Sequence, residues 1–213
     1  MKKSPLNKIL TESAEKKILT FMKDDYLFRE NERSDGVYFI ITGKVKITRH
    51  ENRPAHTILN LVKPGDVLGI HAVVNEHNFT SSAVALVKTS VCFVPAEEFR
   101  ELVNLNNDYK LYIMQLLCSN IDLIENKITS RNEKSARERF SELLVLLKDT
   151  YGITEDDELK IDLNLDDLAN LTGTSKGYLG KIIGEYSQKD LIRFKGNVIK
   201  IMNREFLEKE AKV

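Results

Sequence analysis

The chain has 213 residues, 42% of them hydrophobic and 30% charged, a composition typical of globular proteins that bury a core. Its 32 basic and 32 acidic residues cancel, which excludes an overall cationic attraction to nucleic acid or membrane, so any such affinity has to come from locally segregated charge. No apolar run follows MKKSPLNK, and no stretch approaches the roughly 20 apolar residues of a membrane helix. We therefore expect a cytoplasmic protein without a membrane partner.

The two cysteines, Cys92 and Cys118, stand in the apolar contexts SVCFV and QLLCSN. Such contexts suit buried, reduced thiols better than a disulfide framework or a metal clip. We predict a structural role for both cysteines and expect no metal site.

The first part of the chain changes from a helical to a strand pattern. Between residues 4 and 23 the apolar residues recur at broadly helical spacing, which predicts a helix there. They are Leu6, Ile9, Leu10, Ile18, Leu19 and Met22. From Tyr26 to Val94, short runs rich in Val, Ile, Thr and Phe are broken by Gly, Pro, Asn and Asp, as in GVYFIITGKVKITRH. This pattern predicts a compact antiparallel β domain, either a sandwich or a barrel.

From Ala96 the pattern is helical, first in AEEFRELVN and then in a long run over residues 108–131. In the long run, Ile113, Leu117, Asn120 and Ile124 are separated by four, three and four residues, followed by Lys127 or Ile128. This spacing favours a seam that pairs with a second copy of the helix, although a single buried helix gives part of the same pattern. The polar stretch SRNEKSARER, residues 130–139, predicts a hinge, and FSELLVLLKDTYG predicts a helix that stops at Gly152.

The last part of the chain has the pattern of a winged helix-turn-helix. Two short helical segments flank the turn Thr172-Gly173-Thr174, and LIRFKGNVIKI carries a two-residue hairpin signal at Gly196-Asn197. Charge is segregated here: residues 149–167 hold eight acidic side chains and one lysine, a net of −7, and residues 172–200 hold six basic and two acidic side chains, a net of +4.

The second of these helices, SKGYLGKIIGEY, contains three glycines, each costing about 1 kcal/mol against alanine in a helix interior. At about 100° per residue, Leu179, Ile182, Ile183 and Tyr186 share one face, and Gly177, Gly180 and Gly184 cluster nearly opposite, between Lys176 and Lys181. Ser175 is the predicted N-cap. A recognition helix would read DNA with this outward face, although a protein-binding or merely solvated face is the alternative. The predicted DNA-binding residues are Thr174, Ser175, Lys176, Gly177, Tyr178, Lys181, Arg193 and Lys195, with Lys200 beside them in the wing.

Together the β domain, long helix, hinge and winged helix-turn-helix resemble the Crp/Fnr superfamily of bacterial transcription regulators over nearly the whole chain. The resemblance is carried by GVYFIITGKVKI, by KPGDVLG at residues 63–69 and by DDLANLTGTSKGYLGKII. It implies an α+β fold with an effector-sensing, cyclic-nucleotide-binding-like β-roll (jelly roll) over residues 1–107. A dimerisation helix and hinge over 108–135 and a DNA-binding domain over 136–213 would follow. The implied partners are double-stranded DNA and a second copy of the chain, with RNA polymerase as a further candidate.

The resemblance also implies an effector pocket just after KPGDVLG. Its candidate residues are Gly69, Ile70, His71, Thr80, Ser81 and Ser82. Members that bind cyclic nucleotides carry a glutamate after the glycine and, about ten residues later, an arginine for the phosphate. Here Ile70 follows Gly69, and no Lys or Arg lies between Lys63 and Lys88. A desolvated phosphate needs a fixed cation or several N–H donors, so we predict no tight cAMP or cGMP binding. Hydroxyls and a helix N-terminus leave room for a weaker or neutral ligand.

No resident cofactor is expected. His71 and His77 lie in the pocket segment and His50 and His56 in the preceding hairpin; haem-sensing relatives exist, but scattered surface histidines are the commoner explanation. The iron–sulfur branch of the superfamily uses an N-terminal cysteine cluster, which a first cysteine at Cys92 excludes.

The recognition helix departs from the family pattern as well. Family members often begin it with Ser or Cys, then Arg and Glu, with a second Arg further along; here these positions are Ser175, Lys176, Gly177 and Lys181. We expect more of the specificity to come from Tyr178, the lysines and DNA shape.

Two alternatives to an effector-sensing regulator remain. One is a family member with no small effector, controlled by its abundance or by a protein partner. The other is a cupin-like metalloenzyme, which the spacing of His71 and His77 does not support because cupins use an HxH pair. We expect a regulator and not an enzyme.

Overall fold

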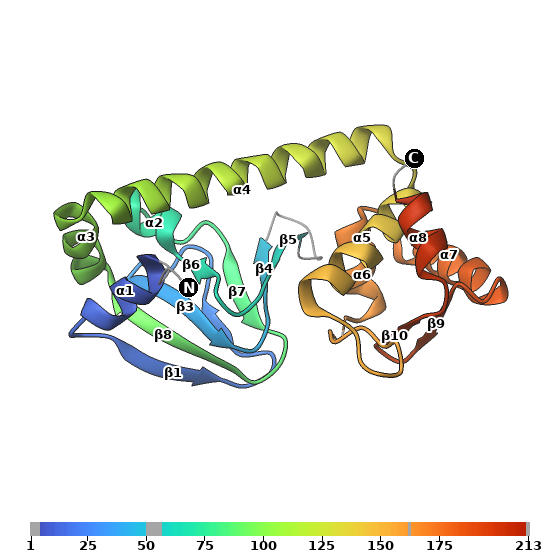
Figure 1. Ribbon diagram of the computed structural model, residues 1–213, viewed down its shortest axis with the longest axis horizontal. Coiled ribbons are helices and arrows are strands. Elements are labelled where there is room, and N and C mark those ends of the chain that lie inside the picture. The colour runs from blue at the N-terminus through green and yellow to red at the C-terminus, as the bar shows by residue number, and fades with distance from the viewer. Residues whose placement is uncertain (1–4, 50–56, 162, 212–213) are drawn as a thin grey trace. The chain divides into compact units, whose positions relative to one another are not determined.

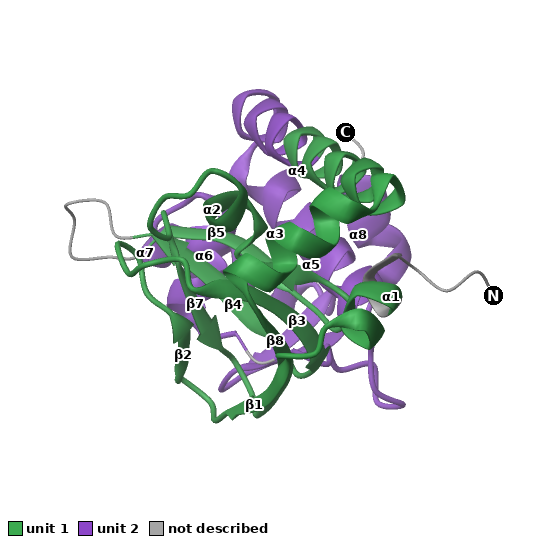
Figure 2. Ribbon diagram, turned by 90° about the vertical axis from the view of Figure 1, so that its left-hand side faces the viewer, with its two compact units in different colours: residues 1–122 green, residues 123–213 purple. Residues whose placement is uncertain are grey.

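The computed structural model describes residues 5–49, 57–161 and 163–211. The chain divides into two compact units, residues 1–122 and 123–213, which Figure 2 colours separately. The helix α4 (Asn107–Glu133) begins in the first unit and ends in the second (Figure 1).

The first unit is built on two four-stranded antiparallel sheets. One has the strand order β1-β8-β3-β6 and the other the order β2-β7-β4-β5. The strands of the first sheet are β1 (Lys17–Phe21), β8 (Thr89–Pro95), β3 (Gly36–Thr42) and β6 (Val67–Leu68). Those of the second are β2 (Tyr26–Phe28), β7 (Ser82–Ala85), β4 (Val45–Arg49) and β5 (Thr57–Val62).

Strand β3 separates two hydrophobic cores because successive side chains of a strand point to opposite faces. Tyr38 and Ile40 pack between the sheets with residues of β2, β4 and β7. Val37 and Phe39 pack on the other face, in a core that includes residues of α1 (Pro5–Glu12), α2 (Ile70–Val74), α3 (Ala96–Leu105) and the start of α4. The first turns of α4 therefore belong to this second core.

The helix predicted over residues 4–23 is only partly correct. Helix α1 ends at Glu12, and Ile18, Leu19 and Met22 lie on β1 or directly after it. The Glu98 carboxylate accepts hydrogen bonds from the Ser13 hydroxyl at 2.5 Å and from the Ala14 N–H at 2.6 Å, which ties down the chain between helix and strand. The prediction treated these apolar residues as one helix, although they belong to a helix and a strand, in which side chains repeat with different periods.

The second unit contains the winged helix-turn-helix. Its helices are α5 (Ala136–Tyr151), α6 (Leu165–Thr172), α7 (Lys176–Gln188) and α8 (Arg204–Glu210), and β9 (Ile192–Lys195) pairs with β10 (Val198–Ile201) to form the wing. Gly152 ends α5 at φ 77°, and Gly196 turns the wing at φ 63°, conformations that favour glycine. The prediction of an α+β protein with an antiparallel β-roll, a long helix and a winged helix-turn-helix is confirmed.

Two finer predictions need correction. The polar stretch 130–139 is mostly helical, because α4 continues to Glu133 and α5 begins at Ala136, so the break is confined to Lys134 and Ser135. Cys92 is buried as predicted, and burial raises the pKa of its thiol. Cys118 is exposed instead, because it lies on the outer side of α4.

Candidate nucleic-acid interface

One face of α7 is anchored in the core of the second unit. Leu179, Ile182, Ile183 and Tyr186 are each at most 8% exposed. The Tyr186 hydroxyl lies 2.9 Å from the Ser141 hydroxyl of α5, and its ring packs against Phe140, with 5.9 Å between ring centroids. Burial raises the pKa of Tyr186, so its phenol stays protonated in this contact. The buried face agrees with the helical wheel, and it determines which side of α7 points outward.

The start of α7 is shaped by a tight turn and an N-cap. Gly173 follows α6 in the left-handed conformation at φ 69°, and its N–H donates to the Asn170 carbonyl at 3.0 Å. Ser175 then caps α7, its hydroxyl accepting from the Tyr178 N–H at 3.2 Å. Thr174 is half-buried in this turn, and Ser175 is exposed.

Arg139 of α5 holds this turn from behind. Its guanidinium donates to the Thr172 carbonyl at 2.8 Å and to the Gly173 carbonyl at 3.3 Å, and it also donates to the carbonyl of Lys134. A Cβ atom on Gly173 would lie 3.1 Å from Nε of Arg131, so the end of α4 is packed closely against the same turn. Sequence reasoning missed both arginines because they fall in the polar stretch interpreted as a hinge.

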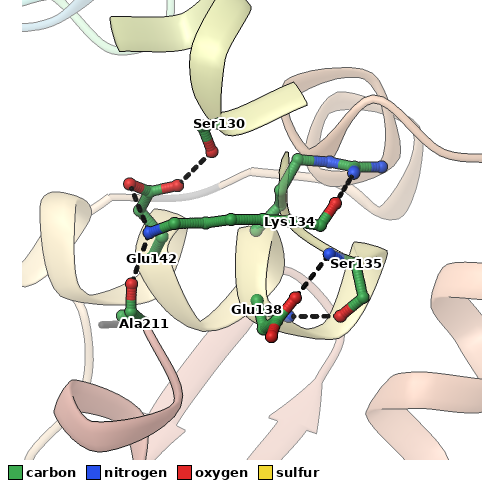
Figure 3. A network of polar contacts seen from close by, with 7 residues as sticks. Ser130, Lys134, Ser135, Glu138, Glu142 and Ala211 are labelled. Atoms are coloured by element: carbon green, nitrogen blue, oxygen red, sulfur yellow. Dashed lines mark hydrogen bonds and ion pairs between the residues drawn. The ribbon is translucent and has the colours of Figure 1, made fainter. Parts of the chain in front are cut away.

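Hydrogen bonds and an ion pair bridge the break between α4 and α5 (Figure 3). The Ser130 hydroxyl donates to Glu142 at 2.5 Å, and the Lys134 ammonium donates to Glu142 at 3.2 Å and to the Ala211 carbonyl at 2.5 Å. Ser135 and Glu138 form a capping box that starts α5. These contacts hold the break against both α5 and the chain just after α8.

The outward face of α7 combines bare backbone with cations. A Cβ atom added at Gly177, Gly180 or Gly184 would meet no atom within 4 Å, so none of these glycines is needed for packing. Lys176, Gly177, Tyr178 and Lys181 are exposed, as predicted. Lys176 forms an ion pair of 2.7 Å with Asp166 on α6, a contact across ten residues that the sequence pattern did not reveal.

The wing presents three further cations on one face. Arg193 and Lys195 are both exposed and two residues apart on β9, and Lys200 pairs directly opposite Arg193 on β10. Since side chains two apart on a strand share a face, all three point the same way. The Arg193 guanidinium and the Asp190 carboxylate form a long ion pair, with 3.9 Å between the nearest nitrogen and oxygen atoms.

The residues predicted to form an effector pocket differ in their burial and in their contacts. Gly69 has φ 89° and begins α2, and a Cβ there would lie 2.8 Å from the Gly36 carbonyl oxygen. Ile70 is 4% exposed in the helix-facing core, and Ser82 is 3% exposed with its hydroxyl accepting from the Glu30 N–H at 2.9 Å. Both were predicted as pocket residues, and both are buried in the described structure.

The remaining pocket candidates differ in exposure. His71 and Thr80 are exposed, and Ser81 is half-buried. The predicted helix N-terminus is that of α2, which has five residues and a left-handed glycine as N-cap.

A buried aromatic cluster lies in the β-roll next to Gly69. The rings of Phe28 and Phe79 stack with centroids 4.0 Å apart, and Tyr38 lies against both, all three being at most 6% exposed. The Cβ position of Gly69 is 3.4 Å from the Phe79 ring. The sequence pattern did not single out Phe79 for this role.

The histidine rings of His71 and His77 lie close together, with 4.9 Å between centroids, and His77 Nδ1 lies 2.7 Å from the Asn78 carbonyl. Across residues 5–49, 57–161 and 163–211 no group of three or more metal-ligating side chains comes together. His50 and His56 lie outside the described residues. No helix in this part of the chain has the length and apolar character needed to cross a membrane.

The predicted seam on α4 starts on the wrong side of the helix. Ile113 is 5% exposed and packs in the first unit's own core with Tyr109, and Leu117 packs partly against that core. Asn120 and Ile124 are exposed. A second apolar row, which is exposed, lies about a quarter of a turn away on the helix and meets the predicted seam at Ile128. It consists of Leu111, Met114, Cys118, Ile121 and Ile128, separated by three, four, three and seven residues.

Comparisons with known proteins agree with this architecture. The family model of the cyclic nucleotide-binding domain matches residues 18–106. The chain is 23% identical over 194 residues to the CRP-like cAMP-activated global transcriptional regulator of Mycobacterium tuberculosis, covering 90% of this chain and 87% of that protein. It is 22% identical over 188 residues to the global nitrogen regulator of Synechocystis, covering 86% and 84%.

A solved structure has the same fold. It is a transcriptional regulator of the CRP/FNR family from Thermus thermophilus, with a TM-score of 0.79 and 20% identity over 92% of this chain and 99% of that one. These relatives are regulators and not enzymes, in agreement with the prediction that this chain is no enzyme. With a match to the cyclic nucleotide-binding domain over residues 18–106, a long helix and a winged helix-turn-helix, the chain is similar over most of its length to transcription regulators of the CRP/FNR type.

Proposed function

We propose that the protein is a homodimeric, DNA-binding transcription regulator that reads a pseudo-palindromic site with α7. The observation that carries this proposal is the outward face of α7, where Lys176, Tyr178 and Lys181 surround glycines that pack against nothing. One face of this helix is buried in the core, and the other carries lysines beside glycines, which have no side chain. Such a helix is suited to bind in the major groove.

Each part of this surface has a chemical task. Lys176 and Lys181 can donate to O6 and N7 of guanine or to phosphates, and the glycines let the backbone come close to the base edges. Arg193, Lys195 and Lys200 of the wing are suited to the neighbouring phosphates. The local excess of four positive charges over residues 172–200 supplies the attraction that the neutral chain as a whole lacks.

The exposed apolar row on α4 supports a dimer. Leu111, Met114, Ile121 and Ile128 are each at least 55% exposed, and their heptad spacing is the one that pairs two helices. A two-fold dimer would present two copies of α7 to two half-sites about one DNA turn apart. RNA polymerase is the further partner that we expect of such a regulator.

A second candidate is a regulator of the same type that has no small effector. The aromatic cluster of Phe28, Tyr38 and Phe79 favours it, because these rings occupy the interior beside Gly69. We propose that cAMP in particular is not the effector, since no arginine or lysine between Lys63 and Lys88 could pair with a buried phosphate.

The cationic face of α7 is tested with Lys176→Gln and Lys181→Gln together. We expect weaker binding to a duplex recovered from a random-sequence pool, and a salt dependence that is flatter by about 0.9 in slope for each phosphate that the variant no longer neutralises. Mobility shift over a series of KCl concentrations measures both quantities. Lys189→Gln removes one positive charge at the C-cap of α7, away from the proposed contact face, and should bind like the wild type. Unchanged affinity in the double variant would refute the proposal.

The glycines of α7 are tested by alanine substitution. Gly177→Ala should stabilise the protein by about 0.5–1 kcal/mol, because the added methyl meets no atom and the helix gains propensity. It should also weaken DNA binding, because the methyl occupies the space that the bases need. Gly184→Ala, about two turns further along, should give the same gain in urea unfolding with little loss of affinity. If Gly177→Ala binds DNA as tightly as the wild type, close approach at this position is not required.

Two neighbouring substitutions on α4 decide which side of the helix pairs. Ile121→Lys places a charge in the exposed apolar row, so we expect monomers in sedimentation and loss of binding to the two-half-site duplex. Asn120→Lys, on the side first predicted as the seam, should remain dimeric. If only Asn120→Lys dissociates the dimer, the side of α4 that was first predicted as the seam forms the contact.

The effector is tested by thermal unfolding with added nucleotides. A ligand that binds only the folded state raises the midpoint as its concentration rises. We expect no shift with millimolar cAMP or cGMP. A concentration-dependent increase would show that the β-roll opens around Phe79 to admit the nucleotide.

A further inference from the structure

Asp166 lies at the edge of the proposed DNA-binding surface. It is in the first turn of α6, and its carboxylate accepts from the ammonium of Lys176, the first residue of α7, at 2.7 Å. Both side chains are more than half exposed, so the pair is open to solvent and to any ligand of α7. No ion pair joins Lys181, the other lysine of this face, to any residue within the described ranges.

An exposed ion pair of this kind contributes little to folding, because water and salt screen it and two flexible side chains are held in place. Its effect on a polyanion is larger. When DNA approaches, Asp166 brings a negative charge to a surface that otherwise attracts phosphates, and salt is partly excluded from the interface. The pair therefore acts on DNA binding more than on stability.

The cost of Asp166 depends on what Lys176 contacts. An ammonium has three N–H donors, so Lys176 can keep one on Asp166 and direct the other two to O6 and N7 of a guanine. In a complex held only by phosphates, Lys176 has to turn towards the backbone, and the Asp166 carboxylate is left unpaired beside phosphate charges.

We propose that Asp166 is a specificity-determining residue, which suppresses non-specific DNA binding by occupying Lys176 until a correctly placed guanine edge is available. The inference rests on the proposed function, since it assigns a role within the DNA-reading surface of α7. It makes discrimination, rather than affinity, the property that Asp166 controls.

The test compares Asp166→Asn with the wild type on two duplexes, one recovered from a random-sequence pool and one with the same composition but scrambled order. We expect affinity for the scrambled duplex to rise several-fold and affinity for the recovered duplex to change much less. The salt slope on the scrambled duplex should steepen by about 0.9, as one more phosphate is neutralised. Asp156→Asn is the matched control, because it removes the same charge from an exposed position outside α6 and α7.

A double-mutant cycle with Lys176→Gln locates the effect. If Asp166 acts through Lys176, Asp166→Asn should change little once that ammonium is gone. Equal gains on both duplexes, equal gains from Asp156→Asn, or an undiminished effect in the Lys176→Gln background would each overturn the proposal. Wild-type protein that does not discriminate between the duplexes would instead refute the proposed function itself, and this inference with it.

Discussion

The buried contact between α7 and α5 is the constraint on which the proposed DNA-reading surface depends. The Tyr186 phenol is 1% exposed and meets the Ser141 hydroxyl at 2.9 Å, so rotating α7 would bury a polar group without a partner. Leu179 and Ile182 fill the same core. Because this face of α7 can lie only inward, the glycines and lysines can lie only outward.

This constraint explains why three glycines are tolerated in a short helix. Packing fixes α7 from its buried side, and the Ser175 N-cap and the Arg139 clamp on the Gly173 turn fix where it begins. Residues of low helix propensity, such as glycine, are then tolerated on the outward face. What results is an outward surface of backbone, two lysines and Tyr178, in which Lys176 is paired with Asp166.

Local patterns predicted the elements well, and tertiary contacts account for what they missed. Three features could be predicted because each depends on a few residues that are close together in the sequence. They are the wing turn at Gly196, the N-cap at Ser175 and the buried face of α7. The seam on α4 could not, because Ile113 has the same spacing whether it packs on its own domain or on a partner. The ion pair between Asp166 and Lys176 could not be predicted either, because the two residues are ten positions apart and no local pattern links them.

The most direct measurement is protection of guanine N7 from dimethyl sulfate on a duplex recovered from a random-sequence pool. N7 lies in the major groove, where α7 is proposed to bind. The account predicts two clusters of protected guanines related by a two-fold axis and centred about 10 base pairs apart. A single cluster, or binding that leaves every guanine N7 reactive, would contradict it.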